Sequence, residues 1–138
     1  MRFFLIFLLS FAILQSKELL YDNLHLKFEP SNYPMSFPKD LVPKEFQANF
    51  YTEFKENSAF LKELTLLGAS TINFAELSKF YRSNLNREEW KLLQSSSSET
   101  EFVYLAEGFG KRSFTVVGKK DGNITKLYFV FKRNRVSL

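Results

Sequence analysis

The residues best suited to chemistry in this chain are basic and lie in its last third. Residues 99–138 carry eight Lys and Arg against four Asp and Glu, whereas residues 17–98 carry ten against eleven. Clustered cations attract anionic polymers and lipid headgroups. We therefore expect a weak anion-binding surface on the hairpins of this region. The expected contacts are Lys111, Arg112, Lys119, Lys120, Lys126, Lys132 and Arg133.

Two further considerations bear on this basic set. Tyr104 and Tyr128 lie among the cations in the sequence and could stack against a bound polymer. Lysines on an edge strand, on the other hand, protect a sheet against edge-to-edge aggregation and need no ligand. The sequence leaves both interpretations open.

Other residue types give no catalytic pattern. The chain has one histidine, His25, and no cysteine, which excludes disulfides, thiolate nucleophiles and thiolate metal sites. Carboxylate pairs such as Glu53 with Glu56 lack a substrate-binding motif beside them. The Ser95–Ser98 run has no neighbouring base, and Gly108–Lys111 lacks the spacing of a phosphate loop. We therefore expect no enzyme activity, no metal and no cofactor.

We expect β-hairpins to carry the seven basic residues named above. Apolar-rich runs at residues 102–106, 113–117 and 124–131 predict three strands. Turns are expected at Gly108–Lys111 and at Asp121-Gly122, since Asp-Gly between such runs is a strong hairpin signal. The alternation predicts that Thr125, Leu127, Phe129 and Phe131 share one face.

A helix precedes these strands. Asn73 can cap it with Glu76 three residues on, and Asn86 ends it. An apolar stripe at helical spacing supports this prediction. The stripe consists of Phe74, Leu77, Phe80, Tyr81 and Leu85. Residues 90–94 then predict a short strand, and Ser95–Ser98 a flexible turn.

The first half is less regular. Alternation predicts a strand that places Leu24, Leu26 and Phe28 on one face. Four prolines between residues 30 and 43 predict a loop, fixed by Tyr33, Met35 and Phe37. Phe46 to Phe54 fits a strand that places Phe46, Phe50 and Phe54 on one face, with Phe60 to Leu67 as its partner. A single helix over residues 44–67 is the alternative.

These elements predict an α+β fold. An antiparallel sheet carries one main amphipathic helix packed on one face, as a two-layer sandwich. Thirteen of the seventeen Phe lie beyond residue 16, and we expect them to fill a core that has no cross-links.

The N-terminus, MRFFLIFLLSFAILQS, predicts a secretory signal peptide. Its apolar run, residues 3–14, would span about 18 Å as a helix, which is too short for a bilayer. Cleavage is expected after Ser16, with Ala12 as the alternative. We expect signal residues 1–16, an N-terminal strand and Pro-rich loop over 17–45, and an α+β domain over 46–138. Residues 17–138 then form one exported globular domain, periplasmic or extracellular and without a lipid anchor.

The order of the helix and the strands that follow it resembles that of a known group of domains. The helix ending in Phe80-Tyr81 and Leu85, the strand opened by Trp90, and the following three-strand meander resemble small exported bacterial domains of uncharacterised function. The resemblance covers about residues 60–132, with Glu89 where those domains have glycine. It implies the fold and the bacterial envelope, and no activity.

The function predicted from the sequence is that of a non-enzymatic cell-envelope module. Its expected partner is another envelope protein. The alternative is binding of an anionic polymer or a membrane surface through the basic C-terminal hairpins. The oligomeric state is left open.

Overall fold

A computed structural model describes residues 18–21, 23–30, 37–55, 62–87 and 89–133. The predicted signal peptide and its cleavage site lie outside these residues, as do Tyr33 and Met35. In the described part of the chain, no helix is long and apolar enough to cross a membrane.

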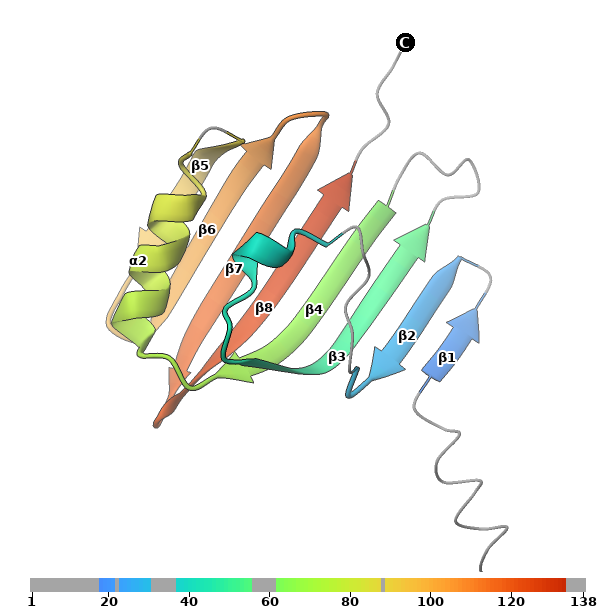
Figure 1. The fold of residues 1–138 in the computed structure, drawn as a ribbon, viewed down its shortest axis with the longest axis horizontal. Helices are drawn as coiled ribbons and strands as arrows, with labels where there is room; N and C mark the ends of the chain where they lie inside the picture. Colours follow the sequence, from blue (N-terminus) through green and yellow to red (C-terminus); the bar gives the residue numbers. More distant parts are fainter. Residues whose placement is uncertain (1–17, 22, 31–36, 56–61, 88, 134–138) are drawn as a thin grey trace, which may run out of the picture.

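Eight antiparallel strands form one sheet in the order β1-β2-β3-β4-β8-β7-β6-β5 (Figure 1). Each half of the chain contributes a four-strand meander, and the two meanders join where β4 pairs with β8. The strands are β1 (Glu18–Tyr21), β2 (Leu24–Phe28), β3 (Phe46–Lys55), β4 (Lys62–Ser70), β5 (Trp90–Ser97), β6 (Glu101–Gly108), β7 (Arg112–Asp121) and β8 (Ile124–Arg133). The predicted mostly-sheet, α+β class is confirmed.

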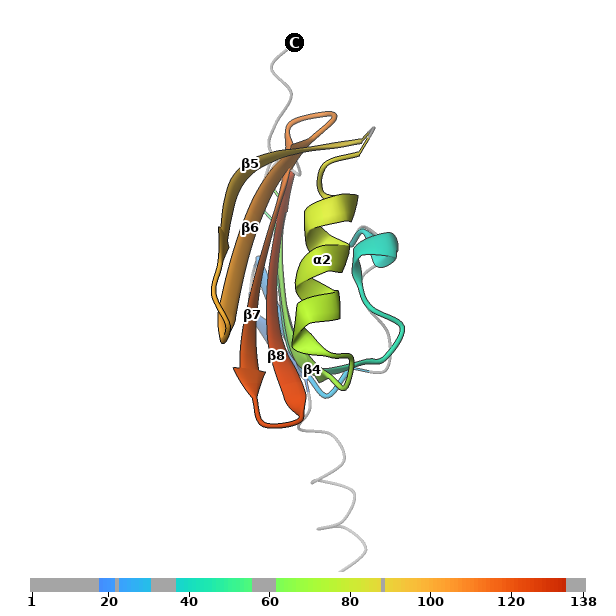
Figure 2. The ribbon, with the colours of Figure 1, turned by 90° about the vertical axis from the view of Figure 1, so that its left-hand side faces the viewer.

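The helix α2 (Phe74–Asn84) and the short 3-10 helix η1 (Lys39–Leu41) lie to one side of this sheet, and the face on that side is here called the covered face (Figure 2). The Asn73 side chain accepts a hydrogen bond of 2.8 Å from the Ala75 amide, as the predicted cap requires. The Tyr81 ring lies 5.9 Å from that of Phe129 on β8.

Alternating residues of the central strands supply the core on the covered face. On β8 the predicted set is confirmed, since Thr125, Leu127, Phe129 and Phe131 are all buried. Their neighbours on β6 and β7 are also buried aromatic residues. These are Phe102, Tyr104 and Phe114. The prediction that phenylalanines fill the core holds at these positions.

Residues 46–54 form a strand, and the alternative helix over residues 44–67 is wrong. The expectation that Phe46, Phe50 and Phe54 share one face is also wrong. The register shifts between Ala48 and Phe50, which marks a β-bulge. Phe46 therefore packs against Phe129 on the covered face, at 5.4 Å, while Phe50 packs against Phe28 on the opposite face, at 5.0 Å.

The predicted flexible turn at Ser95–Ser98 is wrong for its first three residues. Ser95–Ser97 continue β5 and pair with Tyr104, Val103 and Phe102, so the turn begins only at Ser98. Serine is tolerated here because β5 is an edge strand with one side toward solvent. The short strand β1 was not predicted at all; it pairs with β2 through Leu19 and Leu26.

The turn between β7 and β8 differs in detail from the prediction. Asp121 pairs with Ile124, so Gly122 and Asn123 are the two central residues. In the described chain, Gly122 has φ of 60° and Asn123 has no positive φ. Glycine at the first central position is the pattern of a type II′ turn.

Candidate anion-binding site

The predicted basic residues do not gather at one place. Arg112, Lys132 and Arg133 lie at the end of the sheet where β8 finishes and β7 begins. Lys119, Lys120 and Lys126 lie at the opposite end of the same two strands. Arg112 and Lys119 are seven residues apart on β7, so about 23 Å separates the two groups. The predicted contacts therefore form two separate groups, and anion binding by either group stays a prediction.

The aggregation-protection interpretation of these residues is wrong. The edges of the described sheet are β1 and β5, and the predicted basic residues lie on β7 and β8 in its interior, except Lys111, which lies in the turn between β6 and β7. Interior strands have both backbone edges paired, so lysine is not needed there to block further pairing. Another reason is required for the basic residues on these strands.

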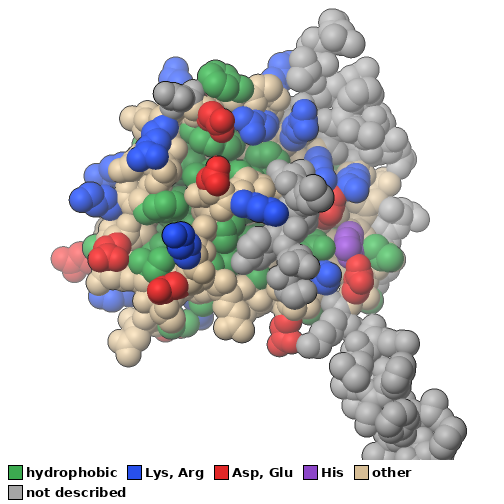
Figure 3. Space-filling view, in the orientation of Figure 1, with side chains coloured by type: hydrophobic (Ala, Val, Ile, Leu, Met, Phe, Trp, Pro, Cys, Tyr) green, Lys and Arg blue, Asp and Glu red, His purple; other side chains and the backbone are tan. Residues whose placement is uncertain are grey.

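Strand pairing builds a row of cations at the first end, on the covered face. Lys62 lies directly opposite Arg133, and Arg133 lies directly opposite Arg112. Lys55 of β3 extends the row beyond Lys62. We call Lys55, Lys62, Arg133 and Arg112 the upper basic row; it crosses four neighbouring strands at the top of Figure 1. In Figure 3, Lys and Arg side chains are frequent in the upper part of this face.

One carboxylate partly neutralises the row. Glu53 Oε1 accepts from Lys62 Nζ at 3.0 Å and from Lys55 Nζ at 3.2 Å. Burial alone would raise the pKa of Glu53, but the hydrogen bonds and charges of the two lysines outweigh it and hold the pKa below its ordinary value. Among the described carboxylates, none lies within 4 Å of the Arg112 or Arg133 guanidinium. The Arg133–Arg112 half therefore carries the uncompensated charge.

Arg112 is held in a defined position. Its Nε donates a hydrogen bond of 2.7 Å to the Phe109 carbonyl, and its guanidinium lies 5.2 Å from the ring centroid of Trp90. Beside it is a pocket of about 630 Å³, which Arg87, Asn84 and Asp40 also line. A guanidinium fixed over an aromatic face loses little rotamer freedom when it binds an anion.

The opposite end is organised differently. Lys119 and Lys126 are directly opposed on the face away from α2, and Lys126 Nζ pairs with Asp121 at 3.1 Å. Of the two predicted stacking residues, Tyr104 is fully buried and its hydroxyl shares a hydrogen bond of 2.6 Å with Ser78, so that prediction is wrong. Tyr128 is 39% exposed, but on the face opposite the upper basic row.

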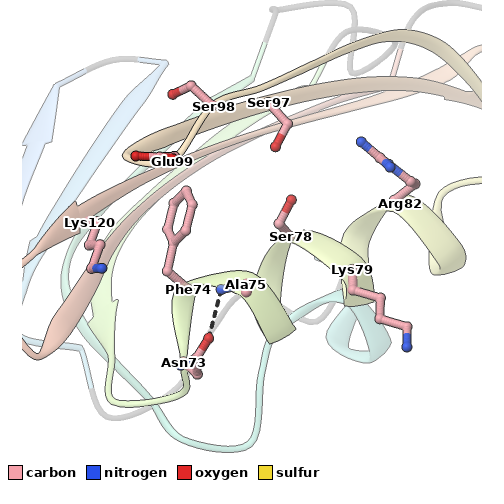
Figure 4. Close-up of a pocket in the computed structure, with 10 residues that line it drawn as sticks. All are labelled: Asn73, Phe74, Ala75, Ser78, Lys79, Arg82, Ser97, Ser98, Glu99 and Lys120. Carbon is pink, nitrogen blue, oxygen red and sulfur yellow. Dashed lines mark hydrogen bonds between the residues drawn. The ribbon is translucent and has the colours of Figure 1, made fainter.

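Lys120 alone of this end points to the covered face, where it lines a pocket of about 600 Å³ between α2 and the β5–β6 turn (Figure 4). Arg82 points into the same space. Two of the three serines around it are engaged in the fold: Ser78 bonds with Tyr104, and Ser98 with the Thr100 and Glu101 amides. The pocket therefore combines cations with the Glu99 carboxylate and with serine hydroxyls, most of which already have partners.

The described structure brings no catalytic set together. His25 contacts Glu18 and packs edge-on against Tyr51 at 5.7 Å, far along the sheet from the serines of β5. No cluster of three metal-binding side chains exists among the residues described. Glu56, the predicted partner of Glu53, lies outside them.

Sequence reasoning missed half of the upper basic row. Lys55 and Lys62 belong to a region with no net positive charge, and only the pairing of β4 with β8 brings Lys62 beside Arg133. No local spacing encodes such a long-range pairing. A partial signal existed in the strand pattern, which places a lysine at the outer end of both β3 and β4.

Comparison with known proteins adds no assignment: no family model, no curated protein and no solved structure matches this chain.

Proposed function

We propose that this protein is an exported, non-enzymatic binding module that holds a linear anionic polymer along the upper basic row. The observation that carries this proposal is the direct opposition of Lys62, Arg133 and Arg112 on three neighbouring interior strands. Like charges placed directly opposite each other destabilise a sheet. An anion bound along the row relieves this repulsion, so the same cations that destabilise the free sheet favour binding.

The spacing of the row suits a chain-like ligand. Neighbouring strands lie about 4.8 Å apart, so the four cations form a line about 14 Å long. A phosphate- or carboxylate-bearing polymer presents charges in a line at comparable intervals. A membrane surface instead favours a broad basic patch, and the basic residues at the other end of β7 and β8 are too distant to complete one.

The helix side of the molecule lies beside the Arg112 end of the upper basic row. We infer that α2 and η1 form a second layer on the covered face, because Tyr81 donates a hydrogen bond of 2.9 Å to the Leu41 carbonyl and is fully buried. Leu41 and Asn84 of this layer line the same pocket as Trp90 and Arg112. Export rests on the signal peptide predicted at residues 1–16, and a partner protein of the envelope stays a prediction.

The experiment is a titration of end-labelled inorganic polyphosphate, followed by fluorescence anisotropy. The test variant is Arg112→Gln with Arg133→Gln; the control is Lys119→Gln with Lys126→Gln, which removes an equal charge from the opposed pair at the other end of the same strands. We expect the test variant to weaken binding at least tenfold and the control less than threefold. Equal losses would refute a defined site, and tighter binding to anionic lipid vesicles than to polyphosphate would favour the membrane alternative.

A further inference from the structure

The face of the sheet opposite α2, here called the open face, is apolar over most of its width. In the described chain no helix or loop covers it (Figure 2). Exposed antiparallel sheets normally place polar residues on the solvent side. Here Phe28, Phe54 and Tyr128 are each 38–42% exposed on this face.

The strand register arranges the open face in rows that run across the strands. One row, from β2 to β6, consists of Leu26, Thr52, Thr65, Val130, Thr115 and Leu105. The next row, in the same strand order, consists of Phe28, Phe50, Leu67, Tyr128, Val117 and Val103. Both rows are centred on the pairing of β4 with β8.

The first row is nearly the same when read from either end. Leucines stand at both ends, threonines stand next to them, and Thr65 and Val130 form the centre. In the second row, large residues on one side of the centre correspond to small ones on the other, as Phe50 does to Val117. A two-fold axis parallel to the strands exchanges β4 with β8, and an isologous interface requires such self-complementarity.

We propose that a second copy of this chain packs its open face against that of the first, about a two-fold axis parallel to β4 and β8. Thr65 then faces the partner's Val130, Leu67 faces the partner's Tyr128, and Phe50 faces the partner's Val117. Two sheets packed in this way keep their strands aligned to within about 30°, so the contacts nearest the axis are the closest.

Charge at the border of the face agrees with this arrangement. The next position along β4 and β8 holds Glu63 opposite Lys132, with 3.7 Å between Glu63 Oε2 and Lys132 Nζ. The proposed axis places Glu63 of one copy over the partner's Lys132, and the reverse. The border is thus complementary to itself and has no net charge at this pair.

The extent of the face also suits a dimer. Eight strands at about 4.8 Å spacing and four rows about 7 Å apart give a face of about 34 by 20 Å, or about 700 Å². A stable interface of standard size buries about 800 Å² per partner.

The test is the oligomeric state of the purified full chain by sedimentation velocity, in variants with charge reversals. Glu63→Lys alone and Lys132→Glu alone each place like charges across the proposed interface, and each is expected to weaken dimerisation at least tenfold. An equimolar mixture of the two variants restores opposite charges between copies, although the pair within each chain stays broken. We expect the mixture to form heterodimers at the wild-type concentration range.

Thr65→Arg is a second test at the centre of the face, with circular dichroism to show that each variant folds. It should give a folded monomer. A wild-type chain that stays monomeric at high micromolar concentration would overturn the proposal, as would single reversals without effect or a mixture that does not associate.

Discussion

Lys62 of β4 and Arg133 of β8 are directly opposite each other in the interior of the sheet and point to the same face. Arg112 adds a third cation on the next strand. Cross-strand neighbours on one face have Cβ atoms about 5 Å apart, so these charges repel one another at low salt. The three cations therefore favour the binding of an anion and lower the stability of the free protein.

Arg133→Gln should make the protein more stable and a weaker binder. We expect the free energy of unfolding to rise by about 0.5 kcal/mol at low ionic strength, because two like-charge neighbours lose their repulsion. Urea unfolding at low and at 1 M salt measures this. The gain should shrink at 1 M salt, where the Debye length is about 3 Å. A loss of stability would show that Arg133 makes a favourable contact in the fold.

Glu53 should make stability depend on acid. Its pKa in the folded state is below the ordinary value of 4.5, so the unfolded chain binds the proton more readily. The stabilisation is complete above the ordinary pKa and is lost as the pH falls through the folded pKa. Glu53→Gln should thus cost about 1–2 kcal/mol at pH 7 and less at pH 3, which is below the ordinary pKa.

Urea titrations at the two pH values test this dependence. Glu107→Gln, an exposed carboxylate on β6, is the matched control and should change stability by less than about 0.5 kcal/mol. A Glu53→Gln effect of equal size at pH 7 and pH 3 would contradict the ion-pair account.

Two substitutions of Tyr81 should separate the contribution of its hydroxyl to stability from that of its ring. Tyr81→Phe leaves the buried Leu41 carbonyl without its donor and should cost about 1–2 kcal/mol. Tyr81→Ala removes the ring from the core beside Phe129 as well and should cost about 3–5 kcal/mol. Thermal melts of the two variants distinguish these effects. If neither variant lowers the melting temperature, α2 does not pack on the sheet.

Gly118→Ala should destabilise the protein although it adds one methyl group. A Cβ at this position would lie 2.2 Å from the Phe102 ring, which is itself fully buried. Overpacking of this kind costs about 1–3 kcal/mol. Lys119→Ala, at the next residue and exposed, is the control in the same urea experiment. A stability equal to wild type would mean that Phe102 has room to move.

Local sequence pattern predicted the elements better than their partners. Helix α2 follows from the Asn73 cap and the stripe through Tyr81, since both signals lie within a few residues. The bulge after Ala48 could not be predicted, because it depends on how β3 meets β4. It moves Phe50 to the open face and so helps to create that face.

The upper basic row could likewise be predicted only in part, because local sequence does not show which strands are neighbours. The excess charge of the last third includes Arg112 and Arg133, but it groups them with Lys119 and Lys126, which lie at the far end of the strands. Net charge in a segment does not tell which end of a hairpin a residue occupies. Lys62 joined the row through a long-range pairing with no local signature.

The most direct test of the upper basic row is the salt dependence of polyphosphate binding. Each cation neutralised by a single-stranded polyanion contributes about −0.7 to the slope of log K against log salt concentration, so three to four cations predict a slope of about −2 to −3. The Arg112→Gln, Arg133→Gln variant should reduce the slope by about 1.4, whereas the Lys119→Gln, Lys126→Gln variant should leave it unchanged. A wild-type slope near zero, or an equal change in both variants, would contradict the account.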